Sequence, residues 1–305
     1  MSAVAVGTDV LQIEDLSVHY RTQTRTIKAV NRVSFSLRPG ERFGLAGESG
    51  SGKSTTALAI MRLIRPPGKI AGGAIRLGER DLARLSEEEM RRVRLAEIAL
   101  IPQGAMNSLN PVRRIRDHFA DSIVAHERNI SATRIRERMS ELLARVELRE
   151  EVARLYPHEL SGGMKQRVCI ALGICLQPKV IIADEPTSAL DVVVQRQVMQ
   201  TLAAVQEQLG ASVILVGHDM GLLAQFVDRL GVMYAGRFVE IAPIREIFRN
   251  PRHPYTRSLV ASLPTLEKKG VFQGLSGRAS IIPDASVIPD LEQIGPDHWV
   301  APHAE

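Results

Sequence analysis

The feature that most constrains this chain is a glycine-rich loop, GESGSGKS, at residues 47–54. It follows the short, mostly apolar stretch RFGLA (residues 42–46), which predicts a β-strand, and it precedes a predicted helix from about Lys53 to Leu63. The loop matches the pattern G-x-x-x-x-G-K-[ST], in which backbone N–H groups and the positive end of the helix dipole converge on one anion. The sequence therefore predicts a phosphate-binding loop between a strand and a helix.

The side chains at the end of this loop predict a nucleotide and its metal ion as the ligand. Lys53 is expected to bring positive charge to the β- and γ-phosphates of ATP, and the Ser54 hydroxyl is expected to ligate Mg²⁺. The residues of this segment that are expected to contact ATP are Gly47, Glu48, Ser49, Gly50, Ser51, Gly52, Lys53, Ser54 and Thr55.

A second stretch, VIIADE at residues 180–185, is an apolar run that ends in two carboxylates. Its all-apolar character predicts a parallel strand that is buried on both faces. Asp184, at the tip of the strand, is expected to help hold Mg²⁺, and Glu185 is expected to polarise the water that attacks the nucleotide. An exposed acidic turn is the alternative interpretation, because carboxylates often follow a strand.

The remaining patterns predict an α/β chain built on a mainly parallel sheet. Further strands are expected at residues 11–20, 27–37, 75–77, 98–101 and 212–216, and a helix is expected through residues 194–209 with Gly210 as its cap. From about residue 104 to 176 helical spacing replaces strand runs, which predicts an inserted helical subdomain within a domain of residues 1–264. Residues 265–305 are expected to form an irregular, weakly patterned C-terminal extension.

Composition limits the compartment and the class of partner. The 305 residues carry a net charge of +5, which favours an anionic partner only weakly, because a solvated surface explains it equally well. Cys169 and Cys175 are expected to be reduced core thiols of a cytosolic protein. No signal peptide is visible, and no apolar stretch approaches the roughly 20 residues that span a bilayer. Any membrane work is therefore expected from a partner chain.

Several further motifs complete a resemblance to the nucleotide-binding subunit of an ATP-binding cassette (ABC) transporter. They are LSGGM at residues 160–164, IPQG at 101–104, SALD at 188–191, His218 after an apolar strand, and Tyr20. The resemblance implies a P-loop ABC ATPase fold, with an antiparallel β subdomain beside the mainly parallel core sheet. A lone histidine or tyrosine is usually structural, but the order and spacing of His218 and Tyr20 around the two strong motifs favour the family roles.

The resemblance also assigns a role to each motif. The signature residues Ser161, Gly162 and Gly163 would present bare N–H groups to the γ-phosphate of ATP held by an opposing subunit. SALD would cross the dimer interface, and Tyr20 would stack on adenine. Gln103 would sense Mg²⁺ and the attacking water, and would couple the site to a membrane partner. The predicted catalytic residues are Glu185, His218, which would contact the γ-phosphate, and Gln103; the predicted Mg²⁺ ligands are Ser54, Gln103 and Asp184.

Longer runs resemble the oligopeptide/dipeptide/nickel importer branch of that family. These runs are MNSLNPV (106–112), YPHELSGGMKQR (156–167), VMYAGRFVE (232–240) and NPRHPYTRSLVASLP (250–264). The resemblance implies a peripheral ATPase on the cytoplasmic face of the inner (plasma) membrane that powers solute import. Its partners would be a second, related but different ATPase subunit, two transmembrane permeases and an extracytoplasmic solute-binding protein, with no nucleic acid. Peptides are the favoured cargo, and nickel or oligosaccharides stay open.

One departure from this branch concerns its tail. Members often end in a cysteine-containing segment that can hold an iron–sulfur cluster, but residues 277–305 contain no cysteine. The run HWVAP (298–302) resembles that tail with its cysteine absent. Since such a cluster needs thiolate ligands, the sequence predicts that none forms.

Other functions fit only parts of the pattern. A soluble ABC ATPase acting on DNA or ribosomes would need a long coiled-coil insertion or a second cassette, and an exporter would usually carry fused membrane spans; the sequence shows none of these. A regulatory nucleotide-binding protein without turnover is disfavoured by the intact Asp184, Glu185 and His218. The sequence therefore predicts an import ATPase in which two ATPs lie between two subunits, closure of the pair switches the permease, and hydrolysis resets it.

Overall fold

The computed structural model describes residues 9–104, 108–263 and 288–303, and these divide into two compact units. The first unit draws on residues 1–12, 36–41 and 75–215, and the second on residues 13–35, 42–74 and 216–305. The domain boundary predicted after residue 264 falls in the segment 264–287, which lies outside the described residues.

In the first unit, three strands lie side by side in one sheet. They are, in spatial order, β8 (Ser212–Val216), β7 (Val180–Asp184) and β6 (Ile98–Ile101). β6 and β7 run parallel. Every residue of β7 and β8 is buried, as expected for strands that are covered on both faces. The continuous apolar runs in the sequence therefore predicted these three strands correctly.

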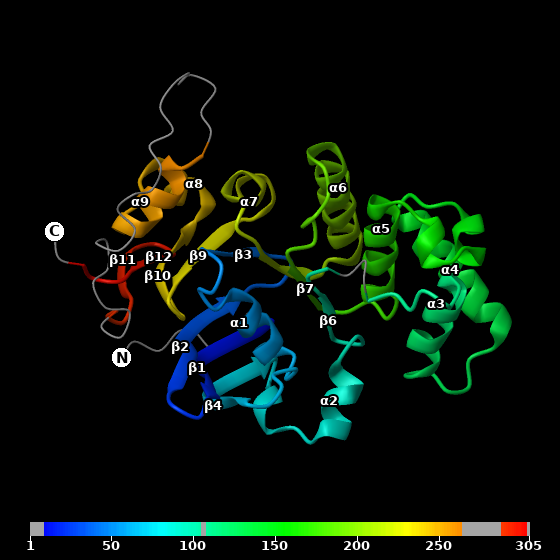
Figure 1. Ribbon diagram of the computed structural model, residues 1–305, viewed down its shortest axis with the longest axis horizontal. Helices are drawn as coiled ribbons and strands as arrows, with labels where there is room; N and C mark the ends of the chain where they lie inside the picture. Colours follow the sequence, from blue (N-terminus) through cyan, green and yellow to red (C-terminus); the bar gives the residue numbers. More distant parts are fainter. Residues whose placement is uncertain (1–8, 105–107, 264–287, 304–305) are drawn as a thin grey trace. The chain divides into compact units, whose positions relative to one another are not determined.

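The helices of the first unit include a bundle that the spacing of residues 104–176 predicted. It contains α3 (Ile115–Val124), α4 (Ala132–Arg145) and α5 (Gly162–Gly173), which contact one another and are drawn in green in Figure 1. Phe119 and Leu143 are fully buried in the apolar faces of this bundle. Short 3₁₀ turns at Glu150–Arg154 and Pro157–Glu159 connect α4 to α5.

Two further helices of the first unit begin at side-chain caps. The side chain of Asp191 accepts from the backbone N–H of Val194 at the start of α6 (Val192–Leu209), and Gly210 ends the helix in the left-handed conformation. The helix α2 (Glu87–Val93) was not expected from the sequence. It begins with a capping box, in which Ser86 and Glu89 satisfy each other's backbone N–H groups.

The second unit contains the strand that leads into the glycine loop. Five strands lie in the order β11 (Glu292–Gly295), β12 (His298–Val300), β10 (Arg237–Pro243), β9 (Arg229–Tyr234) and β3 (Arg42–Ala46). β3 runs parallel to β9, whereas β9, β10, β12 and β11 pair in antiparallel fashion. The helices of this unit are α1 (Lys53–Ile60), α7 (Met220–Phe226), α8 (Ile244–Arg249) and α9 (Pro254–Ala261).

A separate sheet has the strand order β2 (Thr26–Leu37), β1 (Leu11–Arg21) and β4 (Gly68–Leu77). The end of β4 pairs in antiparallel fashion with the short strand β5 (Arg80–Asp81). This sheet corresponds to the predicted antiparallel β subdomain, and β4 is longer than the expected strand at residues 75–77. Together, these elements confirm the predicted α/β fold class with a β subdomain and an inserted helical part. The core sheet, which was predicted to be mainly parallel, is mixed, because β9, β10, β12 and β11 pair in antiparallel fashion.

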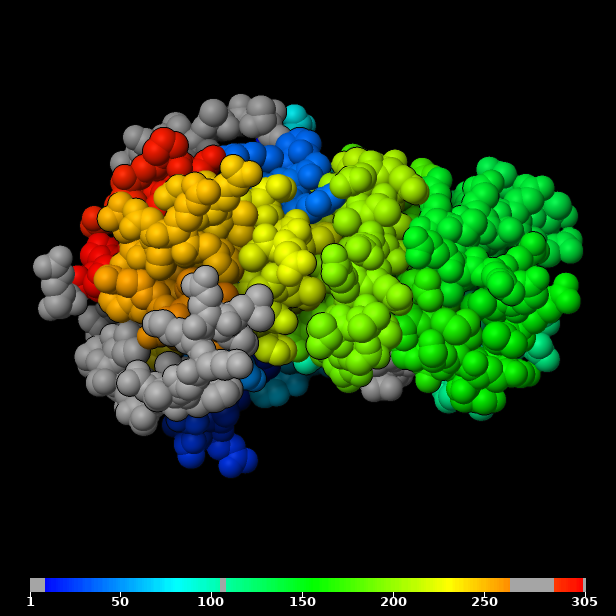
Figure 2. All heavy atoms as spheres, turned by 90° about the horizontal axis from the view of Figure 1, so that it is seen from above, coloured from blue at the N-terminus to red at the C-terminus, as the bar shows by residue number. Residues whose placement is uncertain are grey.

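The C-terminal extension differs from the expected irregular segment. Within its described residues, β12 adds to β10, with Glu240 paired to Val300, and β11 folds back onto β12. Asp290 forms salt bridges with Arg237 and Arg32. Figure 2 shows the described C-terminal residues, in red, beside the orange segment that contains α8 and α9. The sequence failed to indicate these strands because each is only three or four residues long, which is too short for a periodic signal.

Among the helices in the described ranges, none combines the length and the apolar character needed to cross a membrane.

The two cysteines provide a test of the packing of the helical part. Cys169 and Cys175 are 7% and 2% exposed, and neither takes part in a disulfide. Burial raises the pKa of each thiol to about 12, so the reactive thiolate is scarce at neutral pH. We expect Ellman's reagent to label neither thiol in the native chain and to label both after unfolding. Rapid labelling of the native chain would contradict this packing.

Candidate functional site

The glycine-rich loop of the second unit is shaped by close backbone contacts. Gly47 has φ 145° and Gly52 has φ 104°, both in the region that favours glycine. A Cβ atom on Gly47 would lie 2.2 Å from the carbonyl oxygen of Met233, and one on Gly52 would lie 2.4 Å from that of Ala29. Only glycine fits at both positions, and α1 begins directly after Gly52. The loop therefore leads directly into a helix N-terminus, where an anion is favoured.

Lys53 places a positive charge inside this loop. It is 5% exposed, and its Nζ donates to the carbonyl oxygens of Gly47 and Glu48, both at 2.8 Å. A phosphate oxygen would be a stronger partner for this ammonium than these neutral oxygens, because an anionic acceptor adds charge–charge attraction to the hydrogen bond. The geometry thus fits the phosphate-binding role predicted for residues 47–54.

The acidic pair lies at the end of β7 in the first unit. Asp184 is 5% exposed. Glu185, the next residue, has φ 45°, a left-handed conformation that is uncommon for a residue with a side chain and clusters at functional sites. Gln103 follows β6, and its Nε2 donates to Oε2 of Glu185 at 2.8 Å. Two predicted catalytic residues, 82 positions apart in the sequence, are therefore hydrogen-bonded to each other.

The loop after Glu185 contains the SALD run at residues 188–191. Ala189 also has a positive φ, at 67°. Gln195, in the first turns of α6, donates from Nε2 to the carbonyl oxygens of Thr187 at 3.2 Å and Leu190 at 3.0 Å. The Gln195 side chain thus joins the carbonyl groups at residues 187 and 190 of this loop. The sequence did not indicate Gln195, because a lone glutamine in a helix carries no pattern that predicts such a contact.

The signature residues lie at the start of α5. The Ser161 hydroxyl accepts from the backbone N–H of Met164 at 3.3 Å and so caps the helix. Gly163 is buried, and a Cβ atom on it would lie 2.6 Å from Cγ1 of Val194 on α6. The glycine at this position therefore has a packing reason of its own, in addition to the phosphate contact that the sequence predicts for it.

The two remaining predicted residues lie in the second unit. His218 is exposed and follows Gly217, whose N–H donates to the carbonyl oxygen of Leu45 at 3.0 Å. Tyr20 is half-buried on β1, and its ring packs so closely on Gly68 that a Cβ atom there would lie 2.5 Å from Cε1 of the ring. The predicted residues thus divide between the units: Tyr20, residues 47–55 and His218 belong to the second, and Gln103, Ser161–Gly163, Asp184 and Glu185 to the first.

The predicted metal ligands have the chemistry that Mg²⁺ prefers. A hydroxyl at Ser54, a carboxylate at Asp184 and an amide oxygen at Gln103 are all hard oxygen donors. The donor set therefore fits this ion.

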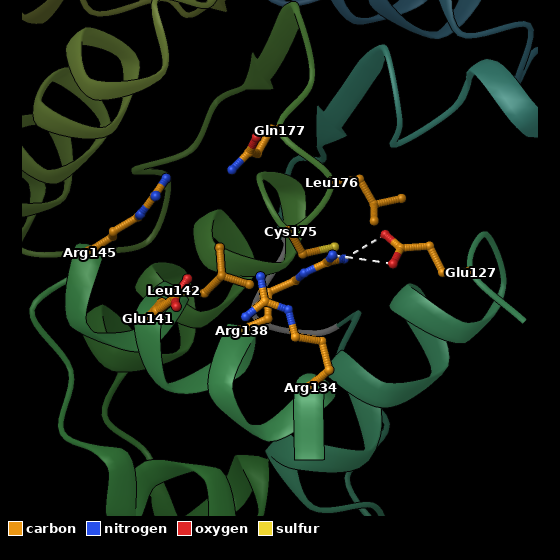
Figure 3. Close-up of a pocket in the computed structure, with 9 residues that line it drawn as sticks. All are labelled: Glu127, Arg134, Arg138, Glu141, Leu142, Arg145, Cys175, Leu176 and Gln177. Carbon is orange, nitrogen blue, oxygen red and sulfur yellow. Dashed lines mark hydrogen bonds and ion pairs between the residues drawn. The ribbon is translucent and has the colours of Figure 1, made fainter. Parts of the chain in front are cut away.

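A hollow of about 350 Å³ in the helical part is a different kind of feature (Figure 3). It is lined by Arg134, Arg138 and Arg145 together with Glu127, and none of the predicted site residues lines it. Arg138 points at Glu127 and donates to both carboxylate oxygens, at 2.6 and 3.2 Å. This ion pair joins α4 to the segment that follows α3, and we assign the hollow no ligand.

Comparisons with known proteins agree with this geometry. The family model described as ABC transporter matches residues 30–188, and the model described as oligopeptide/dipeptide transporter, C-terminal region, matches residues 239–286. The chain is 44% identical over 266 residues to the oligopeptide transport ATP-binding protein OppD of Bacillus subtilis (strain 168), covering 86% of this chain and 74% of that protein. It is 40% identical over 285 residues to the dipeptide transport ATP-binding protein DppD of the same organism, covering 92% and 82%.

A solved structure supports the same assignment. The ATP-binding cassette MJ0796, whose dimeric structure represents a post-hydrolysis state bound to ADP and Pi, superposes with a TM-score of 0.69 at 28% identity. The similarity covers 77% of this chain and 99% of that cassette. These matches agree with the glycine-rich loop and with the hydrogen-bonded pair of Glu185 and Gln103. This chain therefore belongs to the ABC transporter family and is an ABC ATPase.

Proposed function

We propose that this chain is the ATP-hydrolysing subunit of an importer for dipeptides or oligopeptides. The observation that carries the proposal is the match of residues 239–286 to the C-terminal region of oligopeptide/dipeptide transporters, in a chain whose residues 30–188 match the ABC transporter model. Relatives named for oligopeptide and dipeptide transport favour peptides over nickel and oligosaccharides, the other cargoes that the sequence leaves open.

ATP is held, in this proposal, by the loop of residues 47–55, with Tyr20 stacking on the adenine. The Lys53 ammonium exchanges its carbonyl partners for phosphate oxygens, which are better acceptors for a cation. Ser54, Asp184 and Gln103 are the proposed ligands of Mg²⁺, which when bound neutralises phosphate charge.

Hydrolysis depends on Glu185, which polarises the attacking water as a general base. The amide of Gln103 donates to this carboxylate and so fixes its direction. His218 contacts the γ-phosphate from its position after β8. An amide suits Gln103, because it can orient a carboxylate through its NH₂ group and still offer an oxygen acceptor.

The signature residues Ser161–Gly163 act on ATP bound to a second subunit, so the working form is a dimer. The proposed partners are a related but different ATPase, two transmembrane permeases and an extracytoplasmic solute-binding protein, with this chain peripheral on the cytoplasmic face of the inner membrane. Closure of the dimer moves the helical part and the segment at Gln103, which transmits the movement to the permeases.

A substitution of Glu185 tests its proposed role as the general base. Glu185→Gln keeps the shape of the side chain and removes the base, so we expect ATP binding to persist while kcat falls by about 100-fold or more. The variant should also accumulate as a closed, ATP-bound dimer, which size-exclusion chromatography with ATP would detect. Turnover at the wild-type rate would remove Glu185 from the mechanism.

A substitution of Gln103 tests whether its amide orients Glu185. Gln103→Ala removes the donor that orients Glu185, and a hydrogen bond to a charged group corresponds to a loss of about 10- to 100-fold in kcat. Steady-state ATPase kinetics measure the change. Gln208→Ala is the matched control, because it removes the same side chain from an exposed position on α6. Equal activities of the two variants would contradict the orienting role.

Purification from membranes tests the proposed transport role. We expect two multispan permeases and a second ATPase to copurify when the chain is extracted from native membranes in mild detergent. A peptide carried by an associated solute-binding protein would identify the cargo class, whereas nickel or an oligosaccharide there would correct it. Recovery in the soluble fraction with ribosomes or nucleic acid would exclude the import role and leave only the ATPase chemistry.

A further inference from the structure

The second unit contains a fully buried acidic side chain that lies outside the nucleotide motifs. Glu240, on β10, is 0% exposed. Its Oε1 accepts from the backbone N–H of Arg252 at 2.9 Å and lies 2.8 Å from Nε2 of His298 on β12. Its Oε2 accepts from the backbone N–H of His253 at 3.0 Å. A buried carboxylate is tolerated only with such partners, so Glu240 fixes where the chain enters α9.

His253, whose backbone N–H binds Glu240, is itself buried, with 3% of its surface exposed. Its Nδ1 accepts from the backbone N–H of Tyr255 at 3.1 Å and so caps α9. Burial, with His303 beside the ring, lowers the pKa of His253 to about 4, so the imidazole is neutral at physiological pH and can act as an acceptor. The first turn of α9 is therefore held at both Glu240 and His253.

Tyr255 connects the first turn of α9 to the glycine-rich loop of residues 47–54. It is 5% exposed, and its ring lies 4.8 Å from that of Tyr234, centroid to centroid. The backbone N–H of Glu48, the second residue of the loop, donates to the Tyr255 hydroxyl oxygen at 3.1 Å. A side chain from the C-terminal region thus contacts the nucleotide motif across 207 positions of sequence.

The peptide group between Gly47 and Glu48 is held on both sides. Its N–H donates to Tyr255, and its carbonyl oxygen accepts from Lys53 Nζ at 2.8 Å. In a planar trans peptide these two groups point in opposite directions, so the two contacts together determine the rotation of the plane. The Tyr255 hydroxyl therefore orients a carbonyl that positions the Lys53 ammonium.

We propose that Tyr255 is a positioning residue of the phosphate loop, held in place by the buried Glu240–His253–His298 cluster. This inference rests on the proposed binding of ATP by residues 47–55, and it gives the region matched at residues 239–286 a role in nucleotide binding. The loop is preorganised before ATP arrives, so the free energy of ordering it does not have to come from the nucleotide.

Tyr255→Phe tests the proposal, because it deletes the acceptor and retains the ring. Loss of one hydrogen bond of ordinary strength corresponds to a rise of about 2- to 10-fold in the Kd and KM for ATP. We expect kcat at saturating ATP to stay unchanged, because bound phosphates impose the loop conformation that Tyr255 otherwise supplies. A fluorescent ATP analogue and steady-state kinetics on the full-length chain give the two readouts, and thermal unfolding checks the fold.

Tyr234→Phe is the matched control. It removes the hydroxyl of the neighbouring ring at the end of β9 and leaves the Tyr255–Glu48 contact in place, so its affinity should equal that of the wild type. Unchanged affinity of Tyr255→Phe would overturn the inference alone. Failure of the wild-type chain to bind ATP would instead contradict the proposed function, so the two outcomes are distinguishable.

A double-mutant cycle tests the route through the cluster. Glu240→Gln alters the support of α9, so we expect it to weaken ATP binding in the wild-type background and to have a smaller effect when Tyr255 is already Phe. Additive effects would show that Glu240 influences the nucleotide by another path, and would overturn the part of the proposal that assigns it the support of Tyr255.

Discussion

The glycine-rich loop of residues 47–54 depends on a steric constraint, the close approach of its backbone to neighbouring carbonyl groups. Gly47 lies against the end of β9 and Gly52 against β2, at distances that leave no room for a side chain. Because the loop is confined in this way, the carbonyl oxygens of Gly47 and Glu48 meet at the Lys53 ammonium. The chemistry expected of residues 47–55 is thus a consequence of packing: the glycines set the path of the backbone, and the path sets the position of the charge.

A second constraint operates through electrostatics in the interior. Glu240 is an acidic side chain without exposure, and its hydrogen bonds join β10, β12 and the entry to α9. Such a group penalises any arrangement in which one of its partners is displaced, because an unpaired buried carboxylate is costly. The C-terminal residues 298–300 are therefore part of the same packed unit as the phosphate loop, even though the two segments are far apart in the sequence.

The sequence predicted those parts of the fold whose signals are local. β3, β6, β7 and β8 were found because buried parallel strands are continuous apolar runs, and the loop at residues 47–54 was found because its glycines and Lys53 have fixed spacing. β12 and the contact of Tyr255 with Glu48 could not be predicted, since both depend on partners that only the folded chain brings together. The Gln103–Glu185 pair is intermediate: motifs identified each residue, and the structure supplied the bond.

Gly163 shows how two demands can share one residue. Its hydrogen atom faces Val194, so α5 and α6 approach more closely there than any larger residue would permit. A substitution at this position would force the Val194 side chain or one of the two helices to shift, whatever its effect on a phosphate. Loss of activity in a mutational survey would therefore not identify Gly163 as a ligand, since intolerance at this position measures the spacing between helices as much as it measures chemistry.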